Sequence, residues 1–403
     1  MLANRSLITT QRVFVYAVTL AVITNIIGIA LYIHVPSFAE SPGADFVQFY
    51  SAALSSRDNP DKIYDFDAQR ETQKRFSPAA RRGIHWPYLH APFFTVLLIP
   101  LSFFSYAGAF WTWTLLSVIL YISSLALIYR LDPTGAPPLR LLLSVAYASP
   151  VLYWLISTGQ TTAIALLLWT VAFILMKQRQ LFWAAFVMGF LSYRAQYLML
   201  ILPLMLVHRM WSGIFGIATS CLLLFVLGGL AFSFNSYWDY IDAVLFQSRR
   251  IVTLQQPLSH YVTLYGFFRA LLPHSGAVAL TIASALPLIY WLLKSWRNPW
   301  LVQSKVFDLR WALLIVATML LMHHGFVYDL LLLSLAILLL YPYRLLLPPY
   351  YKVVLVVLYF IPYILLIFPD KIPFNPIQPM LYWMCFEIYR LYTIVQSPNA
   401  KLN

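Results

Sequence analysis

Residues 43–92 form the only long polar stretch of this chain and read GADFVQFYSAALSSRDNPDKIYDFDAQRETQKRFSPAARRGIHWPYLHAP. The stretch holds six of the 14 Asp and Glu residues in a chain of 403 residues. Long apolar runs precede and follow it, so we predict a water-exposed loop between membrane-embedded helices. Because the chain gathers its few carboxylates here, we expect this loop to carry the chemistry.

The composition indicates an integral membrane protein. Hydrophobic residues make up 61% of the chain, charged residues only 10%, and the mean hydropathy is +0.74, whereas a soluble domain is about one quarter charged. The net charge of +13 fits Lys and Arg in cytoplasmic loops. These basic residues form no domain of their own, which argues against nucleic-acid binding. Cys221 and Cys385 both lie in apolar runs, so we expect neither a disulfide framework nor a metal cluster.

The charge distribution along the chain predicts its topology. Residues 1–12 carry Arg but no acid and are expected in the cytoplasm, and residues 13–35 form an apolar run that we interpret as an uncleaved first helix. A first outer loop covers about residues 36–106. Its last part, residues 91–106, is broken by Pro100 and is expected at the outer interface or dipping back into it.

Placing the segments rich in Lys and Arg in the cytoplasm predicts a single all-α transmembrane domain over residues 1–403. This domain has about twelve helices and both of its ends in the cytoplasm. Residues 107–129 form its second span. A second large outer loop covers about residues 233–273. The other outer turns are expected at residues 157–160, 193–196, 323–329 and 369–379.

One pair of predicted spans is unusually short. The runs Leu181–Tyr193 and Tyr197–Val207 meet at Arg194, and each is below the usual length of a span. Irregular backbone at membrane depth is tolerated only where it is buried or lines a wet cavity. We therefore expect the outer turns to surround a cavity that opens outward.

The acidic residues of the loop have two interpretations. Asp45 precedes a short apolar and aromatic helix, where it is either an N-cap or a general base at the membrane surface. Asp65 and Asp67 are better interpreted as caps of a second interfacial helix. Arg81 and Arg82 are expected in water or against lipid headgroups.

Several polar residues of the other outer turns are candidates for substrate binding. Arg194 stands between two long apolar runs and should have an anionic partner, either a substrate phosphate or, through the fold, Asp45 or Asp329. His323 and His324 are adjacent and lack a nearby third ligand, so hydrogen bonding is favoured over metal binding. Gln160 and Gln196 either bind substrate or have a structural role, and the sequence favours neither interpretation. Arg249, Arg250 and His260 either steer an anionic lipid or face water.

The sequence has no nucleotide-binding motif of the G-x-x-x-x-G-K-[ST] or G-x-G-x-x-G type and no H-E-x-x-H. A membrane enzyme without such a motif needs an activated substrate that reaches it through the lipid. The alternatives are a transporter or flippase of lipid-linked sugars, for which we find no internal repeat, and a structural membrane protein.

Five motifs in order resemble glycosyltransferase family 87, the polyprenol-phosphate-mannose-dependent transferases of the GT-C fold. They are GADFVQFYSAAL with IYD, PYLHAPFFTVLLIPLSFFSY, STGQTTAIALLL, GFLSYRAQYLMLILPLMLVHRMW and HHGFVYDLLLL, spread over residues 43–335. The chain departs from the family pattern at His90-Ala91 for Tyr-Pro, at Thr162 for Asn and at Arg194-Ala195 for Lys-Pro. The last change keeps the cation.

The resemblance implies an inverting hexosyltransferase in the bacterial inner membrane, with its active site on the outer, periplasmic face. It implies a polyprenyl phosphate sugar, most simply mannose, as donor, a lipid or glycan as acceptor, and neither cofactor nor metal. The family's catalytic carboxylate maps onto Asp45. The residues expected to bind the donor are Arg194, Gln196, Gln160, His323, His324, Asp329, Tyr88 and His90, and those that could steer its phosphate are Arg249 and Arg250.

Overall fold

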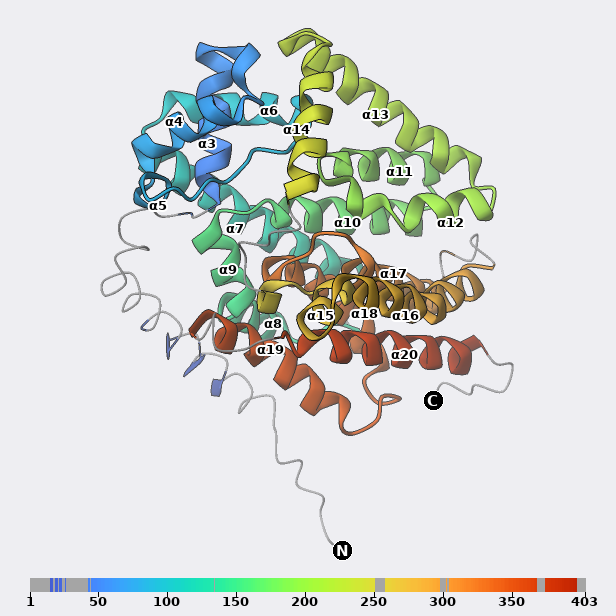
Figure 1. The fold of residues 1–403 in the computed structure, drawn as a ribbon. Coiled ribbons are helices and arrows are strands. Elements are labelled where there is room, and N and C mark those ends of the chain that lie inside the picture. The colour runs from blue at the N-terminus through green and yellow to red at the C-terminus, as the bar shows by residue number, and fades with distance from the viewer. Residues whose placement is uncertain are drawn as a thin grey trace, which may run out of the picture.

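The computed structural model contains only helices in the part of the chain that it describes, apart from an isolated bridge between Tyr261 and Phe326 (Figure 1). This confirms the predicted all-α class. Of the predicted first helix, residues 13–35, only residues 15–16, 19–20, 22–23 and 26 are described, so this helix stays a prediction. The described residues are 15–16, 19–20, 22–23, 26, 43, 45–133, 135–250, 258–297, 302, 304–367 and 374–396.

The helices follow one another through short connections, several of them as 3-10 turns marked η. In chain order they are α3 (Phe46–Asp58), η1 (Pro60–Lys62), α4 (Phe66–Phe76), α5 (Pro78–Arg81), α6 (Pro92–Leu98), η2 (Ile99–Phe103), α7 (Tyr106–Leu131), α8 (Leu139–Tyr147), α9 (Pro150–Thr158), α10 (Thr162–Lys177), α11 (Leu181–Gly189), η3 (Phe190–Leu198), α12 (Ile201–Val207), α13 (Trp211–Phe232), α14 (Ser236–Arg250), η4 (Leu258–His260), α15 (Leu264–Leu271), α16 (His274–Ser295), α17 (Lys305–Leu321), η5 (Val327–Leu332), α18 (Leu333–Leu340), η6 (Tyr341–Tyr343), α19 (Tyr351–Ile367) and α20 (Ile377–Gln396).

Three of the described helices, α7, α13 and α16, are long and apolar enough to cross a membrane. Two bent pairs raise the number to five: α8 with α9, bent by 48°, and α11–η3 with α12, bent by 99°. The apolar helices α6–η2, α10, η5–η6 and α19 are shorter. These values concern the described residues alone, so the count of about twelve spans stays a prediction.

The break predicted at Arg194 is present. The backbone leaves helical geometry at this residue, with φ −134° and ψ 75°, between α11 and α12. The break predicted at Pro100 is also present, because α6 changes there into η2 and α7 begins only at Tyr106. The depth of both segments in the membrane remains a prediction.

Helix α17 passes through the middle of the helical bundle. Phe307 and Trp311 on this helix are fully buried, and the Trp311 ring lies 5.4 Å from that of Trp169 on α10. Helix α20 packs along its other side. Nearer the end of α10, the Lys177 ammonium pairs with the Asp308 carboxylate at 2.8 Å, which ties α10 to α17.

The polar stretch folds into helices α3, α4 and α5 beside α6 and α14 (Figure 1). Asp65 begins α4 by accepting hydrogen bonds from the backbone N–H groups of Asp67 and Ala68, which confirms the predicted cap. Arg81 and Arg82 are exposed, as expected. Asp67 lies in the first turn, where its carboxylate pairs with a neighbouring Arg of the same helix.

Two buried glutamines make α4 a support for the extended segment that follows it. Gln73 donates to the carbonyl of Trp86 at 2.7 Å and accepts from its N–H at 3.1 Å. Gln69 accepts from the N–H of Tyr88 at 3.0 Å and donates to the carbonyl of Ile63. Both side chains satisfy buried backbone groups that no strand partner reaches. They thereby fix the path of the chain toward His90.

Candidate active site

Asp45 is held by a side chain from another turn. It directly precedes α3, yet its carboxylate makes no capping bond to that helix. Instead its Oδ2 accepts a hydrogen bond from Nε2 of Gln160 at 2.5 Å. The N-cap interpretation of this side chain is therefore wrong, because Asp45 already has helical backbone angles and its carboxylate turns toward Gln160.

The Gln160 turn is fitted closely against the start of α3. Gly159 ends α9 with φ 72°, and a Cβ there would lie 2.6 Å from Cβ of Phe46, so this position requires glycine. The Asp45 N–H donates to the carbonyl of Thr158 at 3.0 Å. The indole of Trp113 donates to the carbonyl of Gly159 at 2.9 Å. These contacts fix the distance between Gln160 and the carboxylate.

The environment of Asp45 suits a proton acceptor. Burial raises the pKa of its carboxyl from the ordinary value of 3.8 to about 6, against smaller opposing effects of the Gln160 hydrogen bond, the Arg194 charge and Trp86. A carboxylate with a pKa near 6 is ionised at neutral pH and still accepts a proton more readily than an exposed one. Trp86 was not predicted from the sequence, although it stands within the polar stretch two residues before Tyr88.

Arg194 has a protein carboxylate as its partner. Its Nη1 lies 2.9 Å from Oδ1 of Asp329 and its Nη2 lies 3.2 Å from Oδ2. The Arg194 side chain is 9% exposed and that of Asp329 is fully buried. Of the two protein carboxylates that the sequence left open, Asp45 and Asp329, the structure pairs Arg194 with Asp329. Buried ion pairs of this kind are tolerated only when further hydrogen bonds complete them.

Those further hydrogen bonds are present. Oδ1 of Asp329 also accepts from the hydroxyls of Tyr197, at 2.7 Å, and Thr162, at 2.9 Å. Oδ2 accepts from the N–H of Phe326 at 3.0 Å. The Tyr197 hydroxyl in turn accepts from Nη1 of Arg194. We call Arg194, Asp329, Tyr197 and Thr162 the arginine lock. From the sequence, Thr162 stood out only as a departure from the family pattern, and Tyr197 was not predicted to belong to the site.

A second contact ties the same two turns together. Nε2 of Gln196 donates to the carbonyl of His324 at 2.6 Å, and its Oε1 accepts from the His324 N–H at 3.2 Å. The polar atoms of Gln196 and Asp329 therefore bind protein groups in this structure. Through these bonds both residues position Arg194 and the His323–His324 turn.

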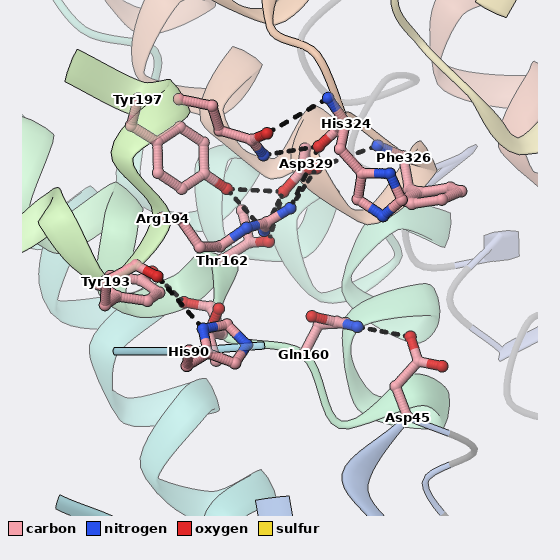
Figure 2. Close-up of polar contacts among 12 residues, drawn as sticks. Asp45, His90, Gln160, Thr162, Tyr193, Arg194, Tyr197, His324, Phe326 and Asp329 are labelled. Carbon is pink, nitrogen blue, oxygen red and sulfur yellow. Dashed lines mark hydrogen bonds and ion pairs between the residues drawn. The ribbon is translucent and has the colours of Figure 1, made fainter. Parts of the chain in front are cut away.

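His90 lies on the same side of the site as Asp45 and is a neutral imidazole (Figure 2). Its Nδ1 is 3.3 Å from the carbonyl oxygen of Tyr193, and because a carbonyl only accepts, Nδ1 carries the proton and Nε2 is left as an acceptor. Burial, and then the Arg194 charge, lower the pKa of His90 to about 3. The same two causes lower the pKa of His324 to about 3.

The remaining predicted donor-binding residues lie in different surroundings. His323 is exposed. Tyr88 is fully buried, and its hydroxyl bonds that of Thr95 at 2.9 Å, so the structure makes it a core residue rather than one that a donor could reach. The side chains of Arg249 and Arg250 lie outside the described residues.

Figure 2 shows the resulting arrangement. Asp45, Gln160 and His90 lie on one side, and the arginine lock with His324 lies across from them. The Arg194 charge lowers the pKa of His90 and opposes the rise in the pKa of Asp45, which indicates electrostatic coupling across the site. Among the described residues, no three His, Cys, Asp or Glu side chains are grouped so that they could hold a metal ion.

Comparison with known proteins supports the family resemblance. Searches of curated proteins and of solved structures return no match. The model of glycosyltransferase family 87 matches residues 88–323, more than half of the chain and inclusive of His90, Gln160 and Arg194. Membership of this family supports a transferase over the transporter and structural alternatives. The long apolar helices of the chain indicate a membrane protein. The chain is thus a member of glycosyltransferase family 87.

Proposed function

We propose that this protein is an inverting hexosyltransferase of GT-C type that uses a polyprenyl phosphate sugar, most simply mannose, as its donor. It transfers the sugar to a hydroxyl of a lipid or glycan acceptor at the outer, periplasmic face of the bacterial inner membrane. The observation that carries this proposal is the Asp45 carboxylate. It is held by Gln160, has a raised pKa, and faces a fixed cation across the site.

The proposed reaction assigns a role to each side of the site. The acceptor hydroxyl attacks the anomeric carbon of the donor while Asp45 takes its proton. The bond between that carbon and the phosphate oxygen breaks on the opposite side, and polyprenyl phosphate leaves with the electron pair. The positive charge of Arg194 stabilises the charge that grows on the phosphate. The lipid phosphate is itself the leaving group, so the reaction as proposed uses no cofactor and no sugar nucleotide.

A comparison of donors tests this assignment. Membranes that contain the protein are expected to transfer radiolabelled mannose from polyprenyl phosphate and not from a sugar nucleotide. Membranes with Asp45→Asn provide the matched control, since they retain every other membrane component. Transfer from the sugar nucleotide by the purified protein, with none from the lipid donor, would contradict the proposed donor.

The pH dependence of transfer should report the titration of Asp45. A base must be deprotonated to act, so kcat/KM is expected to rise as the pH increases through about 6 and to level off above it. The measurement is a profile of kcat/KM from pH 4.5 to 8 in proteoliposomes. A rising limb centred near pH 4, the value of an ordinary Asp, would show that the buried carboxyl of Asp45 does not control the rate.

The outer location of the site can be tested with single cysteines. In a Cys221→Ala background, a cysteine at Asp67, whose side chain is 89% exposed, should react with an impermeant thiol reagent added from outside. A cysteine at Gln178, an exposed residue between α10 and α11, should react only after the membrane is opened. The opposite pattern would place Asp45 in the cytoplasm and exclude the proposed face.

A further inference from the structure

Tyr328 is a buried residue whose hydroxyl has no hydrogen-bond partner among the described residues. Its side chain is 7% exposed, and it immediately precedes Asp329 on η5. Its contacts among the described residues are with rings and charges: Phe326 lies at 5.5 Å between ring centroids and the guanidinium carbon of Arg194 lies 5.8 Å from its ring. Its hydroxyl makes no hydrogen bond to any described residue. A buried phenol normally finds a partner for its hydroxyl.

The hydroxyl is also not sealed inside the protein. In the described part of the chain, the fully buried polar atoms that lack a hydrogen-bond partner do not include this hydroxyl. Part of its surface is therefore accessible, although the ring is covered. The Tyr328 phenol lies within electrostatic range of Arg194, Asp329 and Asp45. Its hydroxyl is therefore available to a ligand at the candidate active site.

Arg194 also has one hydrogen-bond donor without a partner among the described residues. Its Nη1 and Nη2 are used by the arginine lock and by the carbonyl of His324. Its Nε–H makes no hydrogen bond to any described residue. The arginine lock therefore fixes the guanidinium by its two terminal nitrogens and leaves its remaining N–H for another acceptor.

The two sides of the site differ in hydrogen-bonding character. On the side of Asp45 the groups facing a ligand accept: the Asp45 carboxylate, which Gln160 holds by one oxygen, and Nε2 of neutral His90, which has no hydrogen-bond partner among the described residues. Near Arg194 the Nε–H of this residue and the phenol O–H of Tyr328 can donate, and neither has a hydrogen-bond partner among the described residues. The neutral imidazole of His324 on this side offers one donor and one acceptor nitrogen. Acceptors suit the proton of an attacking hydroxyl, and donors suit the oxygens of a phosphate.

We propose that the Tyr328 hydroxyl, together with Nε–H of Arg194, binds a phosphate oxygen of the lipid donor on the leaving-group side. This inference rests on the proposed function. The phenol keeps its proton and donates a hydrogen bond that strengthens as charge moves onto the phosphate when the bond to the anomeric carbon breaks. Tyr328 is therefore a donor-binding residue that acts beside Arg194.

The test removes one oxygen atom. Tyr328→Phe should retain the thermal stability of the wild type, because the hydroxyl makes no bond within the described protein. It should lower kcat/KM for the polyprenyl phosphate donor by roughly 10- to 100-fold, the effect of one hydrogen bond to a charged group, and leave the KM for the acceptor unchanged. Tyr197→Phe is the matched control: its hydroxyl belongs to the arginine lock, so it should lower stability.

Two results would overturn the inference. One is an unchanged kcat/KM for the donor in Tyr328→Phe. The other is a loss of stability equal to that of Tyr197→Phe, which would make the hydroxyl structural. Both presuppose a wild type that uses the lipid donor. A wild-type protein that neither uses this donor nor binds polyprenyl phosphate would instead contradict the proposed function itself.

Discussion

Replacing Asp45 by Asn is expected to reduce glycosyl transfer by about a hundredfold or more, the usual size of a general-base effect, while the protein stays folded. Asn keeps the shape of Asp and can still bond Gln160, but it cannot take a proton at neutral pH. The measurement is the initial rate of hexose transfer from the lipid donor by purified variants in proteoliposomes. Near-normal turnover in a folded Asp45→Asn protein would remove Asp45 from the mechanism.

Stability provides an independent readout for the same variant. The folded-state pKa of Asp45 is raised, so the folded protein binds more protons than the unfolded chain between about pH 4 and 6. The contribution of Asp45 to stability is therefore present below pH 4 and is lost as the pH rises through about 6. Asp45→Asn should consequently be no less stable than the wild type at pH 7. Asp65→Asn is the contrasting control, since Asp65 is exposed and caps α4, and it should leave turnover near normal.

Replacing Arg194 by Ala is expected to destabilise the protein by about 3–5 kcal/mol, the cost of breaking a buried pair. The reason is that Asp329, which is fully buried, would keep its charge without its main partner. Asp329→Asn should destabilise for the converse reason. Thermal unfolding of the detergent-solubilised variants, together with donor affinity, measures both effects.

The double variant Arg194→Ala with Asp329→Asn is the decisive comparison. Because the two residues form one network, their effects should not add, and the double variant should recover much of the stability lost by Arg194→Ala. Its transfer activity should stay low, since the cation is gone. Strictly additive losses of stability, or a normally stable Arg194→Ala protein, would contradict the pairing.

The sequence predicted those features that depend on local pattern. The all-α class, the break at Arg194 and the cap at Asp65 each follow from apolar run length, an ionisable residue within an apolar run, or a short-range hydrogen bond. The resemblance to the family also brought together turns that the structure places side by side, including those of Asp45, Gln160 and Arg194 (Figure 2).

The features that escaped prediction depend on tertiary contacts. Asp329 pairs with Arg194 across 135 positions of the chain, and no local rule could choose it over Asp45. Gln69 and Gln73 look like ordinary surface residues of a polar helix, yet they are buried against backbone groups of a distant segment. Tyr88 carries a motif but faces the core. Which atoms of Arg194 remain free becomes clear only once its partners are placed.

The most direct test of the account is a single-turnover reaction of the purified protein with a polyprenyl phosphate hexose of known anomeric configuration. Both products are measured: the glycosylated acceptor, whose anomeric configuration is determined by NMR, and the released polyprenyl phosphate. We predict equal amounts of the two, with the anomeric configuration inverted, and formation of neither by Asp45→Asn at a comparable rate. Retained configuration, or transfer of the intact lipid-linked sugar across the membrane without a new glycosidic bond, would contradict the account.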